Sequence, residues 1–100
     1  MPKIFEYFGL VFYIYTNDHL PIHVHVKHGE LESKIEFIYE NAELVDLKLK
    51  KVRGRSSLSI KHIKDAMAFC NKYNEAIKDC WLDIMVFNKP VKAKKITKKI

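Results

Sequence analysis

The sequence predicts an α+β fold: a mainly antiparallel sheet of four to five strands followed by one or two packed C-terminal helices. Two patterns support this prediction. In the first half of the chain, apolar and polar residues alternate with the period of two that is typical of a half-buried strand. In the second half, apolar residues from Ile60 to Ile84 recur at spacings of three, four and seven, which is typical of an amphipathic helix.

Length and composition favour one domain. The chain has 100 residues, of which 48% are hydrophobic and 30% are charged, as in small globular proteins. The last twelve residues contain six lysines and no acid. We therefore expect residues 1–88 to form a single α+β domain and residues 89–100 to be a lysine-rich flexible tail.

The first two strands are expected in the stretches 4–8 and 10–16, which are rich in aromatic and β-branched residues. Gly9 separates them, as in a hairpin. Residues 17–21 read Asn-Asp-His-Leu-Pro, a composition that favours a turn because Asn and Asp bond locally and proline disfavours helix before it.

Three further segments alternate in polarity and are expected to be strands: 22–26, 31–37 and 44–52. In the first of them, Val24 and Val26 lie on one face, while His23 and His25 lie on the other. We expect the valines to enter the core and the histidines to lie on the polar face.

Gly29 and Glu30 fit a two-residue type II′ turn, which would pair His28 with Leu31. The same register places Lys27 opposite Glu32, His25 opposite Lys34, His23 opposite Glu36 and, on the buried side, Val24 opposite Ile35. Both histidines of the strand are therefore expected to share the polar face with Glu36. His28 has the parity of the buried face.

The helical segment is preceded by serines at positions 56, 57 and 59, which are good N-cap residues. The apolar stripe predicts either one helix or two helices end to end with a break near residues 71–74. Trp81 is expected to anchor the core, and His62 is expected on the surface of the helix.

The positive charges gather outside the acidic part of the chain. The formal net charge is +6, and residues 1–88 carry 12 basic and 12 acidic side chains. A basic strip without acids is the candidate nucleic-acid-binding segment: Lys48, Lys50, Lys51, Arg53 and Arg55. The alternative is a solvated strand end that only improves solubility.

Two observations bear on the cellular context. Cys70 and Cys80 are the only cysteines, and their spacing fits no zinc motif, so we expect reduced thiols in a cytoplasmic protein. No stretch reaches the roughly 18–20 apolar residues of a membrane span, so we expect no membrane partner.

Four of the five histidines fall within residues 19–28, and imidazole is the commonest metal ligand. His23 and His25 alternate on one strand face, so their rings can approach one ion. With His19 from the turn, they form the candidate metal set for a divalent transition metal such as zinc. The sequence does not establish whether any cofactor is bound.

The same residues suit acid–base chemistry. A histidine held by a carboxylate can act as general base and a second histidine as general acid, as cleavage of a phosphodiester requires. The candidate catalytic residues are His19, His23, His25 and Glu36. The alternative is a sheet face whose histidines have no catalytic role, so the sequence leaves open whether the protein is an enzyme.

The chain resembles a small bacterial and archaeal family, the domain of unknown function 4160. The resemblance is carried by Met1-Pro2, the aromatic stretch 12–15, the block from Asn17 to Gly29 with its His-x-Pro-x-His-Val-His-Val pattern, and Asn74 with Trp81. The chain departs from the family at Ile22, where proline is frequent, and in its lysine tail. The resemblance implies a cytoplasmic protein, and a partner protein encoded by a neighbouring gene.

From residues and resemblance together, we expect a toxin–antitoxin-like or regulatory module that binds a partner protein or a nucleic acid, RNA or DNA, through a histidine-bearing sheet face. The alternatives are a small metal- or histidine-dependent hydrolase acting on phosphodiesters, and a structural interaction protein without an active site.

Overall fold

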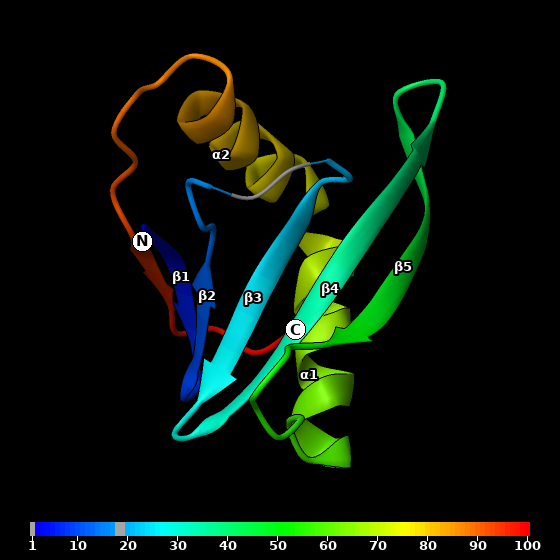
Figure 1. Ribbon diagram of the computed structural model, residues 1–100, viewed down its shortest axis with the longest axis vertical. Coiled ribbons are helices and arrows are strands. Elements are labelled where there is room, and N and C mark those ends of the chain that lie inside the picture. Colours follow the sequence, from blue (N-terminus) through cyan, green and yellow to red (C-terminus); the bar gives the residue numbers. More distant parts are fainter. Residues whose placement is uncertain (1, 18–19) are drawn as a thin grey trace.

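The computed structural model describes residues 2–17 and 20–100 and confirms the α+β class (Figure 1). Its elements in chain order are β1 Lys3–Tyr7, β2 Leu10–Tyr13, β3 His23–His28, β4 Leu31–Glu40, β5 Glu43–Lys51, α1 Ile60–Lys72, α2 Asn74–Met85 and β6 Lys94–Ile96. The described strands form one sheet in the order β5-β4-β3-β2-β1-β6. Among these described strands, β1 and β6 pair parallel and the other neighbours pair antiparallel.

Both helices lie on the same side of the sheet (Figure 1). The core between these layers is built around Phe69 of α1. The Phe69 ring stacks on Phe12 of β2 at 4.5 Å between centroids and meets the edge of Phe5 of β1 at 5.4 Å. Aromatic pairs in these geometries stabilise a core beyond the area that they bury. Within the part of the chain that the structure describes, the other face of the sheet carries no helix, and we call it the helix-free face.

The predicted register of the β3–β4 hairpin is confirmed at every pair, from His28 opposite Leu31 to His23 opposite Glu36. Gly29 has a φ of 60°, whereas Glu30 does not adopt a positive φ, so the turn has the conformational signature of type II′. Val24 and Val26 are fully buried on the helix side, as their parity predicts.

The helical half forms two helices end to end, which is one of the two predicted alternatives. Ser59 caps α1, because its hydroxyl accepts a hydrogen bond from the backbone N–H of His62. Tyr73 ends α1 and precedes α2, which places the break within the predicted range. Trp81 is 2% exposed, in agreement with the expected core anchor.

The lysine-rich segment differs from the expectation of a flexible tail. Its residues 94–96 form β6 and pair with Phe5–Tyr7 of β1, so the sheet gains an edge strand beyond the four or five expected. Within the described residues, no helix has the length and apolar character needed to cross a membrane.

Candidate functional site

The helix-free face carries a polar cluster that is almost completely buried. His23 is 5% exposed, His25 is 6% exposed and Glu32 is 2% exposed. The alternation of polar and apolar residues along the strands predicts the face on which these side chains lie. It also suggests that they are exposed to solvent. Their burial corrects that expectation, and it requires each polar group to have partners.

The carboxylate of Glu32 is the centre of this cluster. Its Oε2 accepts hydrogen bonds from the Tyr15 hydroxyl at 2.8 Å and from Nδ1 of His25 at 2.9 Å. Its Oε1 lies 3.2 Å from Nε of Arg55 and 4.0 Å from Nζ of Lys27. We call these five residues the Glu32 network. Its members come from four segments, which are the stretch after β2, β3, β4 and the stretch after β5. The other members all contact the Glu32 carboxylate.

Two of these contacts hold the His25 ring in place. Glu32 lies diagonally across the β3–β4 pair from His25, a distance that long side chains can span. The Tyr15 ring stacks on the imidazole at 3.9 Å with an interplanar angle of 9°. A histidine with a carboxylate on Nδ1 has its tautomer set, so Nε2 carries the lone pair in the neutral ring.

His23 has its tautomer set in a similar way. Its Nδ1 lies 2.8 Å from the carbonyl oxygen of Pro21, which can only accept, so Nδ1 carries the proton. The His23 ring lies 5.4 Å from that of His25 and 5.1 Å from the Trp81 ring of α2. The two rings therefore form a neighbouring pair of oriented imidazoles, as the sequence predicts.

The predicted carboxylate, Glu36, lies near a lysine. Glu36 lies opposite His23 in the β3–β4 register, but its carboxylate oxygen lies 3.9 Å from Nζ of Lys34. The carboxylate bonded to His25 is that of Glu32. Parity places both acids on the helix-free face, and the sequence offers no signal that selects Glu32.

The candidate metal set is only partly described. His19 lies outside the described residues, together with Asp18. Among the residues that the structure describes, no group of three or more His, Cys, Asp and Glu side chains is arranged to hold a metal ion. His23 and His25 supply two oriented nitrogen ligands of the type that zinc accepts.

The basic strip divides between two faces. Lys48 pairs with Glu36 and Lys50 pairs with Lys34, so both lie on the helix-free face. Lys51 pairs with Ser33 and has the opposite parity. Arg55 joins the Glu32 network, and Arg53 is exposed in the segment after β5.

The remaining histidines form a separate pair on the helix side. His28 of β3 and His62 of α1 have ring centroids 4.0 Å apart, and Nδ1 of His62 lies 3.0 Å from the Ser59 hydroxyl. His28 thus has the parity predicted for it. His62, expected to be a surface residue, is half-buried against it.

The cysteines offer no nucleophile to this site. Burial raises the pKa of the Cys70 thiol, and burial followed by the nearby Asp83 raises that of Cys80. A raised thiol pKa leaves little thiolate at neutral pH. Covalent catalysis by either cysteine is therefore disfavoured.

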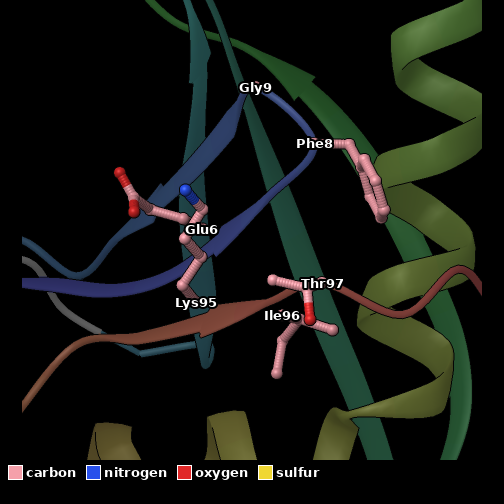
Figure 2. A pocket seen from close by; sticks show the side chains of 6 residues that line it. All are labelled: Glu6, Phe8, Gly9, Lys95, Ile96 and Thr97. Carbon is pink, nitrogen blue, oxygen red and sulfur yellow. The ribbon is translucent and has the colours of Figure 1, made fainter.

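A hollow of about 460 Å³ lies at the β6 edge of the sheet (Figure 2). It is lined by Glu6, Phe8, Gly9, Lys95, Ile96 and Thr97. It lies against β6 and the turn after β1, and no histidine lines it. The candidate site is therefore on the helix-free face and not in this hollow.

A family model described as Domain of unknown function (DUF4160) matches residues 9–82. The chain belongs to this family. The DUF4160 match includes every residue of the Glu32 network together with His23 and Trp81, whereas β1 and β6 lie outside it. No curated protein and no solved structure matches the chain.

Proposed function

We propose that the helix-free face binds a nucleic-acid strand, and that the protein is a cytoplasmic module of a toxin–antitoxin-like or regulatory system. The nucleic-acid part of this proposal is supported by the arrangement of the face. The toxin–antitoxin-like context is supported only by the family resemblance, which implies a partner protein encoded by a neighbouring gene.

One cross-strand row carries the proposal. The strand registers align Tyr13 of β2, His25 of β3, Lys34 of β4 and Lys50 of β5 as consecutive neighbours. Three strand spacings of roughly 4.8 Å make this row about 14 Å long. We call it the basic row. Two lysines in line with an aromatic ring suit a single strand, whose phosphates meet lysines and whose bases stack on aromatic side chains.

The Glu32 network leaves the basic row positively charged. Its carboxylate is held by Arg55, Lys27 and His25, so it is compensated inside the fold. Lys34 lies 3.9 Å from Glu36, and its side chain is 30% exposed. Lys48 and Lys50 are exposed on the same face. This surplus of exposed cations favours a polyanionic ligand.

Fluorescence anisotropy with a labelled single-stranded RNA tests the proposal. The Lys34→Ala/Lys50→Ala variant should weaken binding and reduce the slope of log affinity against log salt by about 1.4, since each lost phosphate contact of a single strand contributes about 0.7. The control is Lys61→Ala/Lys64→Ala, which removes two exposed lysines from α1 on the other side of the sheet.

Equal loss in both variants would indicate unspecific attraction to a basic protein and would contradict a site on the helix-free face. Absence of binding at low salt would contradict nucleic-acid binding altogether. It would then favour the interaction protein without an active site.

A second candidate function is hydrolysis of a phosphodiester. It is favoured by one observation: His23 and His25 are neighbouring imidazoles, each with Nδ1 held by an acceptor. One ring could serve as general base and the other as general acid.

Incubation of the labelled RNA with wild type and with His23→Asn tests this second function. Cleavage that His23→Asn abolishes, while RNA binding persists, would support hydrolysis. Loss of that cleavage with a chelator would indicate a metal at the histidine pair. Intact RNA after long incubation with wild type would contradict hydrolysis and leave binding as the function.

A further inference from the structure

The β5 edge of the sheet is open for pairing. β5 is the terminal strand of the sheet, and Figure 1 shows no other segment along its outer side. Two of its apolar side chains are exposed, Val45 at 51% and Leu49 at 41%. An edge strand with exposed apolar residues is a template for pairing with another strand.

The direction of the free backbone groups follows from hydrogen bonds inside the fold. The N–H of Phe37 donates to Ile22 before β3, so odd-numbered residues of β4 bond toward β3 and even-numbered residues bond toward β5. The β5 partners of those even-numbered residues are Asp46, Lys48 and Lys50. Their backbone groups point inward.

The backbone groups of Leu47 and Leu49 therefore point outward, away from β4. A second contact agrees with this parity: the N–H of Leu47 donates to Oδ1 of Asp46 at 2.8 Å. This N–H has a side chain as its acceptor, not a strand. The outer edge of β5 thus offers regularly spaced groups for an added antiparallel strand.

The order of charges along β5 identifies the added strand. Acidic residues lie near its beginning, Glu43 and Asp46, and basic residues lie near its end, Lys48, Lys50 and Lys51. An antiparallel copy of β5 reverses this order. When Leu47 lies opposite Leu47 of the second copy, Asp46 of each copy lies opposite Lys48 of the other.

The same register satisfies the other requirements of the edge. Val45 falls opposite Leu49, so the two exposed apolar side chains cover each other. Leu47 pairs with itself through outward groups, as a hydrogen-bonded pair requires, when its N–H exchanges the Asp46 carboxylate for the Leu47 carbonyl of the second copy. A register with Lys48 opposite Lys48 of the second copy would keep the same hydrogen-bonding groups facing each other. It would place like charges together, which is repulsive. A bulge at Val45 marks where the regular edge begins.

We propose that β5 is a homodimer interface, in which two copies of this chain pair antiparallel about Leu47 with reciprocal Asp46–Lys48 contacts. Directly opposed residues of an antiparallel pair lie on the same face. The two helix-free faces therefore become one continuous surface, on which each basic row ends opposite Leu44 of the other copy. The dimer does not depend on nucleic-acid binding, although it would enlarge the surface for it.

Sedimentation equilibrium of wild type and of two single variants tests the interface. Asp46→Lys places lysine against lysine in both reciprocal contacts, and Lys48→Asp places acid against acid. Each change should raise the dimer dissociation constant about tenfold or more, because two attractive cross-strand pairs become repulsive. An equimolar mixture of the two variants should regain a heterodimer, since both contacts are then attractive.

The control is Lys61→Asp, an equal charge change on exposed α1, which should dimerise as wild type does. Wild type that stays monomeric at millimolar concentration would overturn the proposal, and an unrelated strand bound at the edge would then assign β5 to another partner. Dimers that both variants leave unchanged would also overturn it, because the interface would lie elsewhere. Failure of the mixture to regain the dimer would overturn the register.

Discussion

Nδ1 of His25 lies 2.9 Å from Oε2 of Glu32, and both side chains are almost fully buried on the face of the sheet that carries no helix. Tyr15 and Arg55 complete the surroundings of the same carboxylate. A buried carboxylate is tolerated only when its oxygens are hydrogen-bonded, so the network constrains the fold locally as well as orienting the imidazole.

Replacing Glu32 by Gln should lower the free energy of unfolding by about 3 kcal/mol, because it removes the anion that faces Arg55 and Lys27 and leaves one fewer buried acceptor for the Tyr15 hydroxyl and His25. Denaturant unfolding measures the change. The matched control is Glu36→Gln on the same strand and face, whose ion pair with Lys34 is more open to solvent; it should cost less than about 1 kcal/mol. Equal costs for the two variants would contradict a central role for Glu32.

Tyr15→Phe should lower the free energy of unfolding by about 1 kcal/mol, since it removes the hydroxyl that donates to Glu32 but keeps the ring stacked on His25. Thermal unfolding followed by circular dichroism gives the comparison. Tyr13→Phe is the control, because the Tyr13 hydroxyl makes no hydrogen bond within the described residues, and it should be nearly neutral. A neutral Tyr15→Phe would show that the hydroxyl is dispensable.

Ala42→Gly should stabilise the protein by about 0.5–1 kcal/mol. Ala42 has a φ of 68° in the turn between β4 and β5, a left-handed conformation in which a Cβ atom is strained and glycine is not. The same substitution at Ala68, exposed on α1, should instead destabilise by about 1 kcal/mol. Opposite signs in denaturant unfolding would confirm the turn conformation, whereas loss of stability in both would contradict it.

Stability should fall in alkaline solution partly through Tyr39. Burial, followed by the nearby carboxylate of Glu75, raises the pKa of Tyr39 from 10.0 to about 12. The unfolded chain therefore loses this proton first, so the contribution of Tyr39 is intact below pH 10 and declines as the pH rises toward 12. In Tyr39→Phe this part of the decline should be absent.

Unfolding free energies of wild type and Tyr39→Phe from about pH 9 to about pH 11 provide the measurement. The variant also loses the hydroxyl contact with the carbonyl of Asn74 at 3.3 Å, so the slopes are compared and not the absolute values. Parallel slopes would show that the phenol titrates alike in both states.

The hairpin of β3 and β4 was predictable in detail because its determinants are local. A glycine at the first turn position and strict alternation on both sides leave one register in which apolar and charged sets match. The parity of His23, His25 and His28 followed from the same register. The sixth strand was not predictable, because Lys94–Ile96 has little strand character and pairs with β1 from far along the chain.

The sequence by itself determined the fold class, the face of every β3 residue and the proximity of His23 to His25, since period-two alternation and turn chemistry act between near neighbours. Only the tertiary structure decided that this face is buried and that Glu32 is the carboxylate bonded to His25. That choice depends on Tyr15 and Arg55, which reach Glu32 from the segments after β2 and β5. Alternation gives Glu32 and Glu36 the same parity, and only packing between distant segments distinguishes them.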